Sequence, residues 1–430
     1  MTHPQDRSGR PDGPKHVVFV TWKAGNAPAF EAAKRLGHHV TLVRSLAMEQ
    51  SQNVDFDASP YARFVDRVHV LEDATDPGAL RECVLAVHAR RPIDGFVATV
   101  DALVVPVARI AEEIGVPFTD ARAAETAKQK NRCREVLAAA GVDTTRHAVV
   151  GGFREAAAFA AATGYPVVVK PARGSGSEGA HVVADEERLR EVLHRAGDGD
   201  AYAAGVLVEE YLSGRFLSAE IGLARGRFLR LAVSERSTWH RHEALETGTT
   251  IPAGIGADEH DRVMEFAEAV VGALGLRLGV FHVEVMLGED GTPRLIEVNP
   301  RIMGSCLPNL FTLAGGGDIF ELLVRVHLDE EIEPAAPAFS RYATVRWFGA
   351  AELTPKPARV PDLGWAAEYG DSLHAFTVRF PDGDVLLPCR GNLGNFGEVQ
   401  VVHPDRETSI RIAEDIVGRT ADLLGIEVTR

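Results

Sequence analysis

The chain has 430 residues, of which 45% are hydrophobic and 25% are charged, the balance of an ordinary globular protein. This composition excludes a largely disordered chain, a collagen-like repeat and a coiled coil. The formal net charge of −15 argues against general binding to nucleic acid or to an anionic membrane, so we expect neither as a partner.

Residues 1–14 are polar and contain no apolar stretch, so we expect a disordered tail rather than a signal peptide. The cysteines are widely spaced and form no CxxC pair, which favours neither a zinc site nor a disulfide framework. These features predict a cytoplasmic protein. The cysteines are Cys83, Cys133, Cys306 and Cys389.

Residues 15–120 alternate short apolar runs with helical patterns, which predicts a doubly wound α/β domain with a parallel sheet. The predicted strands cover residues 16–22, 39–44, 68–71 and 95–100, and the predicted helices cover residues 27–36 and 77–90. No GxGxxG motif follows the first strand, so this domain is a poor candidate for a dinucleotide site.

Residues 121–212 are expected to form a small domain of helices and strands. A helix over residues 121–140 is interrupted near Lys128 and ends at Gly141. The predicted strands that follow cover residues 146–150, 165–172, 181–184 and 206–212.

Residues 213–335 are expected to form a larger antiparallel domain, and residues 336–430 an α+β subdomain packed on it. The larger domain contains a hairpin over 216–235, a helix over 258–274 and two strands over 280–287 and 294–299. The subdomain contains strands over 343–348 and 399–403 and a closing amphipathic helix over 407–424.

The strand that carries Lys170 leads into a loop rich in glycine and serine. Glycines let backbone N–H groups approach phosphate oxygens closely, and a lysine at the foot of the loop adds a positive charge. The alternative is a flexible hairpin loop with a surface lysine. A Walker A motif is excluded, because no Gly-Lys-Ser/Thr opens a helix here. The loop contains Gly174, Ser175, Gly176, Ser177 and Gly179.

Two predicted neighbouring strands carry Glu284, Glu297 and Asn299 on polar faces that alternate with apolar ones. Two carboxylates and an amide form a set of oxygen ligands suited to Mg²⁺. The alternative is a solvent-facing polar strand face. It is weakened because Asn299 ends its strand and brings Arg301 to the same rim.

These motifs, in this order, resemble the ATP-grasp superfamily, and among its members the carboxylate–amine ligases, over residues 16–330. The resemblance implies an ATP-grasp fold of mixed α/β and α+β class: an N-terminal doubly wound domain, a small lid domain and a C-terminal antiparallel sheet domain. ATP would lie between the lid and the sheet.

The resemblance also implies roles for individual residues. Lys130, in the segment KNRCREVLAAAGV, and Lys170 would contact the ATP phosphates, with the glycine loop. The hinge at residues 208–212 would bind adenine through main-chain groups of Glu210 and Leu212, with Glu209 nearby. Many relatives have a ribose-binding Glu shortly after the hinge, and Phe216 takes that place here. Either Glu209 alone holds the ribose, or the nucleotide sits slightly differently.

The metal carboxylates of the family match Glu284 and Glu297, with Asn299 completing the set. Two Mg²⁺ ions are expected, with Mn²⁺ as the alternative metal. The phosphate-facing arginine of the family matches Arg301, which with Lys170 would stabilise negative charge during catalysis.

A loop-like stretch over residues 237–248 resembles the family segment that borders the acceptor site. Trp239, His242 and Glu246 could contact substrate there, together with Arg301. The alternative for each loop residue is a solvated side chain.

The resemblance predicts an ATP-dependent ligase that activates an amino acid carboxylate as an acyl phosphate. The acyl phosphate would react with an amine, expected to be a second amino acid, and ADP and phosphate would be released. A homodimer is expected. One alternative is a purine-pathway or carboxylase-type enzyme of the same superfamily. Another, disfavoured by the metal residues, is a non-catalytic ATP-binding protein.

Overall fold

The computed structural model describes residues 13–52, 54–173, 179–197, 205–239, 245–350, 353–380, 383–389 and 394–428. Most of the predicted N-terminal tail lies outside these residues. So do five predicted site residues, which are Gly174, Ser175, Gly176, Ser177 and His242.

The N-terminal region forms a four-stranded parallel sheet with the order β3-β2-β1-β4. Its strands are β1 (His16–Val20), β2 (His39–Ser45), β3 (Arg67–Leu71) and β4 (Gly95–Ala98). Its helices are α1 (Pro28–Arg35), α2 (Leu46–Gln52), α3 (Pro77–Arg90) and α4 (Asp101–Ile114), with short 3₁₀ turns η1 (Ala24–Asn26) and η2 (Ala62–Phe64). All residues of the central strand β1 are buried, and so are all residues of β4 at the edge of the sheet, as expected of a parallel sheet whose faces are covered. The predicted parallel sheet is confirmed.

The next region contains a smaller antiparallel sheet with the order β5-β8-β6-β7. Two helices precede it, α5 (Ala121–Lys128) and α6 (Lys130–Ala139), and Gln129 between them has an extended backbone, so the predicted interruption is confirmed. The strands are β5 (His147–Val150), β6 (Val167–Pro171), β7 (His181–Val183) and β8 (Val206–Glu210). The helices α7 (Phe153–Thr163) and α8 (Glu186–Gly197) pack against this sheet around Ala156, Ala160 and Leu189.

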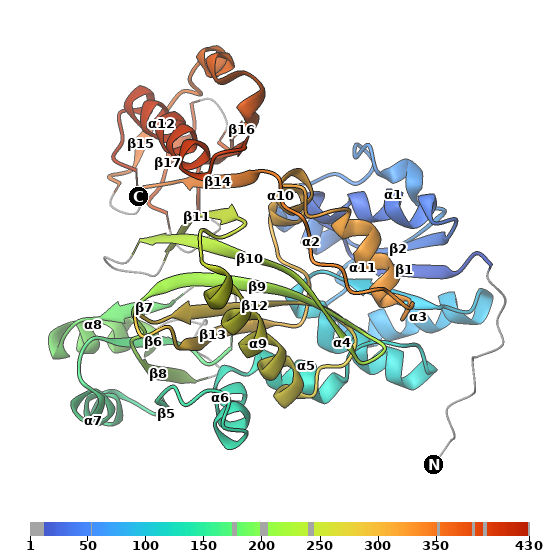
Figure 1. Cartoon of the computed structure of the whole chain (residues 1–430), viewed down its shortest axis with the longest axis horizontal. Helices are drawn as coiled ribbons and strands as arrows, with labels where there is room; N and C mark the ends of the chain where they lie inside the picture. The colour runs from blue at the N-terminus through green and yellow to red at the C-terminus, as the bar shows by residue number, and fades with distance from the viewer. Residues whose placement is uncertain are drawn as a thin grey trace.

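An eight-stranded antiparallel sheet dominates the rest of the chain, with the order β13-β12-β9-β10-β11-β14-β18-β16 (Figure 1). Its strands are β9 (Arg215–Ala224), β10 (Arg227–Trp239), β11 (Leu245–Ile251), β12 (Gly279–Leu287), β13 (Pro293–Asn299), β14 (Tyr342–Phe348), β16 (Leu373–Val378) and β18 (Gly397–His403). Strand β14 pairs with β11, so the C-terminal region continues the same sheet. Its other elements are β15 (Lys356–Pro357), η4 (Gly364–Ser372), β17 (Val385–Leu386) and α12 (Arg406–Leu424).

The loop-like structure predicted over residues 237–248 is wrong at both ends. Ser237–Trp239 belong to β10 and residues 245–248 to β11, and Ser237 pairs with Gly248. The prediction failed because the polar side chains of these strands, Arg236 and Glu246, bind each other inside the protein instead of facing solvent.

Helices hold the two main sheets together. α9 (Ala257–Leu274) packs on β9 and β12 through Val263, Phe266 and Val270. α10 (Leu307–Leu313) and α11 (Ile319–His327) belong to a core that includes apolar residues of both β1 and β10. This shared core fixes the N-terminal sheet beside the end of β13. None of the helices in the described ranges is both long and apolar enough to cross a membrane.

Candidate active site

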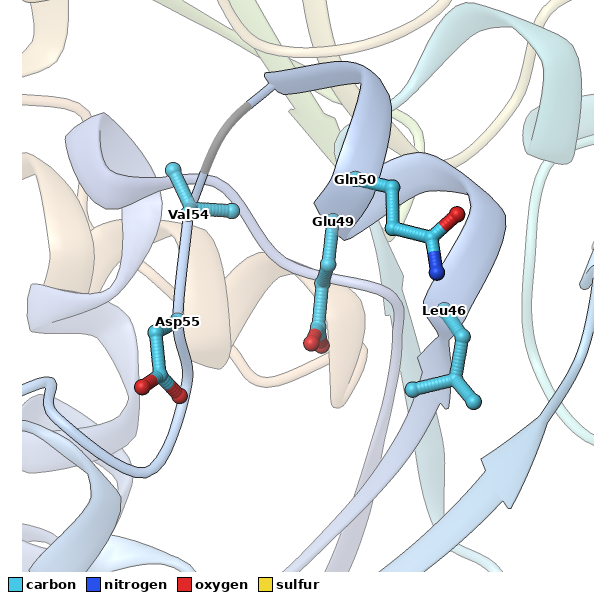
Figure 2. A pocket seen from close by; sticks show the side chains of 5 residues that line it. All are labelled: Leu46, Glu49, Gln50, Val54 and Asp55. Atoms are coloured by element: carbon cyan, nitrogen blue, oxygen red, sulfur yellow. The ribbon is translucent and has the colours of Figure 1, made fainter.

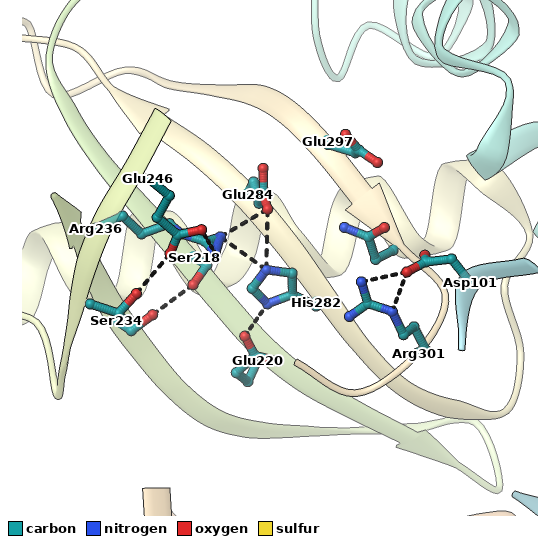
Figure 3. A network of polar contacts seen from close by, with 12 residues as sticks. Asp101, Ser218, Glu220, Ser234, Arg236, Glu246, His282, Glu284, Glu297 and Arg301 are labelled. Atoms are coloured by element: carbon teal, nitrogen blue, oxygen red, sulfur yellow. Dashed lines mark hydrogen bonds and ion pairs between the residues drawn. The ribbon is translucent and has the colours of Figure 1, made fainter. Parts of the chain in front are cut away.

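The candidate site is built around the paired strands β12 and β13. β12 carries His282 and Glu284, and β13 carries Glu297 and Asn299. Glu284 lies directly opposite Glu297, and His282 lies opposite Asn299. Figure 3 shows the two carboxylates on neighbouring strands of the sheet. The structure therefore brings together the three oxygen-bearing side chains that the sequence predicted.

Basic side chains neutralise the Glu284 carboxylate. Nη1 of Arg236, from β10, donates to Oε1 of Glu284 at 2.8 Å, and Nε2 of His282 lies 3.3 Å from the same oxygen. Burial alone would raise the pKa of Glu284. The charges of Arg236 and His282 outweigh burial and hold this pKa at about 2. Glu284 is therefore an anion throughout the physiological pH range.

Two further carboxylates hold Arg236 and His282 in place (Figure 3). Glu246 of β11 accepts from Nε and Nη2 of Arg236, at 2.9 and 2.8 Å, and Glu220 of β9 makes a close hydrogen bond with Nδ1 of His282. Burial would lower the pKa of His282, but Glu220 raises it to about 9. The row Glu246, Arg236, Glu284, His282 and Glu220 therefore alternates in charge, which compensates for burying each charge.

Lysines approach the site from the helices and from β6. Lys128 and Lys130 each place Nζ 3.7 Å from an oxygen of Glu297. Burial lowers the pKa of Lys130, Glu297 opposes this effect, and the positive charge of Lys170 adds to it. Lys130 and Lys170 therefore lie close enough for the charge of one to affect the other.

The buried carboxylate of Glu209 anchors Lys170. Glu209 lies 2.6 Å from Nζ of Lys170 and accepts from Arg134 at 2.8 and 3.2 Å. Burial would raise the pKa of Glu209, but Arg134 and Lys170 hold it at about 2. Because the carboxylate is engaged in these pairs, its predicted role toward ribose stays a prediction.

Asp101 joins the N-terminal domain to this cluster. It opens α4, and its Oδ2 accepts from Nε of Arg301 at 2.7 Å, with Nη2 2.6 Å away. Its Oδ1 accepts from Nζ of Lys128 at 2.8 Å, and Lys128 also donates to Oδ1 of Asn299 at 3.1 Å. Burial would raise the pKa of Asp101, but Arg301 and Lys128 hold it well below its usual range.

The remaining predicted residues lie on the surrounding elements. Glu210 ends β8, where its backbone N–H donates to Arg146 O at 2.9 Å, and Leu212 follows in a half-buried position. Trp239 ends β10. Phe216, in the place of the expected ribose-binding residue, lies 5.3 Å from the Arg236 guanidinium. Gly179 precedes β7, on the described side of the glycine loop.

The donor set of Glu284, Glu297 and Asn299 fits a hard divalent cation. Each supplies an oxygen, and the carboxylates remain about one-fifth exposed, at 19% and 18%. Among the described residues, no group of three or more His, Cys, Asp or Glu side chains is placed to hold a metal ion.

Family models match both halves of the site. The ATP-grasp N-terminal domain model matches residues 30–118, and the ATP-grasp domain model matches residues 163–309. The chain belongs to the ATP-grasp superfamily. The second match contains the strands and loops that carry Lys170, Glu209, Glu284, Glu297 and Arg301.

Named relatives of this ATP-grasp chain include carboxylate–amine ligases. It is 28% identical to mouse (Mus musculus) carnosine synthase 1 over 361 residues, which cover 78% of this chain and 42% of that protein. The chain thus spans less than half of that relative. It is 28% identical to D-alanine–D-alanine ligase of Pseudomonas entomophila over 227 residues, which cover 51% of this chain and 70% of that enzyme.

Among solved structures, the L-amino acid ligase of Bacillus licheniformis superimposes on this ATP-grasp chain with a TM-score of 0.76 and 21% identity. The match covers 94% of this chain and 98% of that one. At this identity the likeness shows a shared fold, and it confirms the predicted ATP-grasp architecture.

Several polar residues of this ATP-grasp site were not predicted from the sequence. They are Asp101, Lys128, Arg134, Glu220 and Arg236. One signal pointed toward the site, because Lys128 lies two residues before Lys130 in the sequence. Arg236 stands between the polar residues Glu235 and Ser237, so alternation does not mark it. Asp101 and Glu220 carry no comparable sequence signal.

A cavity of about 290 Å³ lies in the N-terminal domain of the ATP-grasp chain (Figure 2). Its lining includes Glu49 and Asp55, and Figure 2 shows both carboxylates. Glu49 already accepts hydrogen bonds from Trp22 at 2.8 Å and from Arg44 at 2.9 and 2.7 Å. The cavity shares none of its lining residues with the charged site, and we assign it no role in catalysis.

Proposed function

We propose that the chain is an ATP-dependent ligase that activates an amino acid carboxylate as an acyl phosphate and joins it to an amine. The products would be an amide, ADP and inorganic phosphate. The observation that carries the proposal is the meeting of Glu284, Glu297 and Asn299 with Lys130 and Arg301 at the end of β13. The named relatives, which include dipeptide-forming ligases, support it.

In the proposed reaction, Lys130 and Lys170 bind and orient the phosphates of ATP. Glu284, Glu297 and Asn299 would hold Mg²⁺, which when bound neutralises phosphate charge. An oxygen of the substrate carboxylate attacks the γ-phosphorus, the bond from the β,γ-bridging oxygen to that phosphorus breaks, and ADP leaves.

The amine nitrogen then attacks the carbonyl carbon of the acyl phosphate, loses a proton and expels phosphate. Arg301 stabilises the negative charge that develops on the carbonyl oxygen. Its guanidinium is held by Asp101 before substrate binds, so little reorganisation is needed at that moment. Lys170 adds positive charge on the phosphate side.

The proposal is tested by an ADP-release screen across pairs of amino acids and simple amines, with mass spectrometry of the products. We expect one equivalent each of ADP, phosphate and amide. Stoichiometric AMP and pyrophosphate would contradict the acyl-phosphate route. ADP release that depends on bicarbonate, with a carboxylated product, would favour the carboxylase-type alternative.

A further inference from the structure

Lys23 lies at the edge of the N-terminal sheet that adjoins the candidate active site. Strand β1 ends at Val20, which pairs with Ala98 at the end of the parallel strand β4. Lys23 and Asp101 each follow three residues after these ends, so both leave the sheet at the same edge. Asp101 is the residue that binds Arg301.

A close backbone contact fixes Lys23 in this place. η1 follows Lys23 directly, and a Cβ atom added at Gly25 would lie 2.1 Å from the carbonyl oxygen of Ser305. Ser305 belongs to the segment that begins at Arg301. The backbone that follows Lys23 is therefore packed tightly against the segment that follows Arg301.

The charges around Lys23 are out of balance. Lys23 is half-buried, and within the described part of the chain its ammonium has no hydrogen-bond or ion-pair partner. Burial and the positive charge of Arg301 lower the pKa of Lys23, while Asp101 raises it. Asp101 is already shared by Arg301 and Lys128. One carboxylate thus serves three cations, and a half-buried cation without a partner favours an anion from outside the chain.

We propose that Lys23 binds the free carboxylate of the acceptor, so that the enzyme uses amino acids, rather than simple amines, as the nucleophile. This inference rests on the ligase function proposed above and names the class of its second substrate. The donor carboxylate is converted to the acyl phosphate beside Lys170 and the metal residues. The acceptor carboxylate does not react, and it needs a cation that stays in place throughout the reaction.

Lys23 suits this task because it is separated from the nucleotide-binding lysines. Lys130 and Lys170 come from α6 and β6 and act on each other. Lys23 comes from the N-terminal sheet, and the charges that act on it are those of Arg301 and Asp101. An acceptor carboxylate bound at Lys23 would keep its amine near Arg301, where the acyl phosphate reacts.

The test compares an acceptor amino acid with its carboxamide, which keeps the amine but lacks the charge. For the wild-type protein we expect kcat/KM to be about tenfold to a hundredfold higher with the amino acid, the range of a hydrogen bond to a charged group. Lys23→Met should remove this preference by slowing only the amino acid, with the KM for ATP unchanged. Lys23→Arg should restore part of it. Lys34→Met, which alters a surface lysine paired with Asp66, is the control.

Equal use of amino acid and carboxamide by the wild-type protein would overturn the inference, and so would a rise in the KM of the donor acid in Lys23→Met. Binding of both compounds is also measured by thermal shift in the presence of ATP, which requires no turnover. If no pair releases ADP but binding still depends on the carboxylate and on Lys23, the proposed reaction fails and the Lys23 site stands. If neither compound binds preferentially, the Lys23 site fails as well.

Discussion

Asp101 and Arg301, 200 residues apart in the sequence, form an ion pair that links the N-terminal domain to the end of β13. Arg301 can stabilise charge on a reacting group only if its guanidinium is held in place, and Asp101 supplies that support. If Arg301 acts as proposed, the pair would make the N-terminal domain contribute to the position of a catalytic group.

Asp101→Asn should lower kcat by about ten- to a hundredfold, because a small displacement of a catalytic group costs rate of this order. The KM for ATP should change little, since Lys130 and Lys170 are untouched. Steady-state kinetics with both substrates measures the change in kcat separately from the change in each KM. Glu113→Gln, at the exposed far end of α4, is the control. An equal rise in both KM values would point to a displaced domain instead.

Glu297→Gln should reduce turnover by about a thousandfold or more, because the loss of a metal ligand removes several kcal/mol of transition-state stabilisation. The substitution keeps the shape of the side chain, so the melting temperature should fall little. A Mg²⁺ titration of activity should shift to higher concentration in the variant. Glu289→Gln, in the exposed turn between β12 and β13, is the matched control. Wild-type activity in Glu297→Gln would show that Glu297 is only a polar strand residue.

Arg236 bridges the carboxylates of Glu246 and Glu284. Glu246→Gln should therefore weaken the binding of Arg236 at one end and change the position and charge environment of Glu284 at the other. We expect the apparent Mg²⁺ affinity to change severalfold, with a smaller effect on the acceptor KM. Activity measured against Mg²⁺ and against the acceptor decides between these roles. The opposite pattern, a changed acceptor KM at constant Mg²⁺ dependence, would support the direct substrate contact predicted from the sequence. Glu265→Gln, on the exposed side of α9, is the control.

The buried ion pairs that Glu209 forms with Arg134 and Lys170 should make the free energy of unfolding depend on pH in the acid range. The folded-state pKa is lowered to about 2, from 4.5 in the absence of neighbours. These pairs therefore contribute fully above about pH 4.5, and the contribution is lost as the pH falls toward 2. Urea unfolding measures the difference in the free energy of unfolding between the wild-type protein and Glu209→Gln. This difference should be about 2 kcal/mol smaller at pH 3 than at pH 6. A constant difference would mean that Glu209 titrates normally in the folded protein. Glu187→Gln, on exposed α8, should show no such change.

Alternation of polar and apolar residues predicted much of this site. Glu284 and Glu297 sit on neighbouring strands with apolar backs, joined by a turn, as alternation predicted. The exact register that places them opposite each other includes a shift between Glu284 and Val285, which alternation does not predict. The strand that carries Lys170 was equally readable, because Val167 and Val169 are buried on one face while Lys170, on the other face, pairs with Glu209 in the site.

Alternation could not reveal contacts between distant segments. Asp101 is a single acidic residue at the start of a helix, and nothing in its neighbourhood indicates that Arg301 lies across from it. The strands on either side of residues 240–244 resembled a loop because Arg236 and Glu246 are polar, and only their pairing inside the sheet explains their burial. Such pairs depend on the tertiary fold, so the sequence pattern around each residue does not reveal which polar side chains are buried and paired.

The close contact of Gly25 with Ser305 also has a consequence for biosynthesis. Ser305 is synthesised about 280 residues after Gly25, a delay on the order of tens of seconds at typical elongation rates. During that interval the N-terminal sheet exposes the apolar surface that α10 and α11 later cover. A nascent chain should therefore need protection from aggregation until α11 has emerged, and a protein truncated before α10 should be prone to aggregate even though its first sheet is intact.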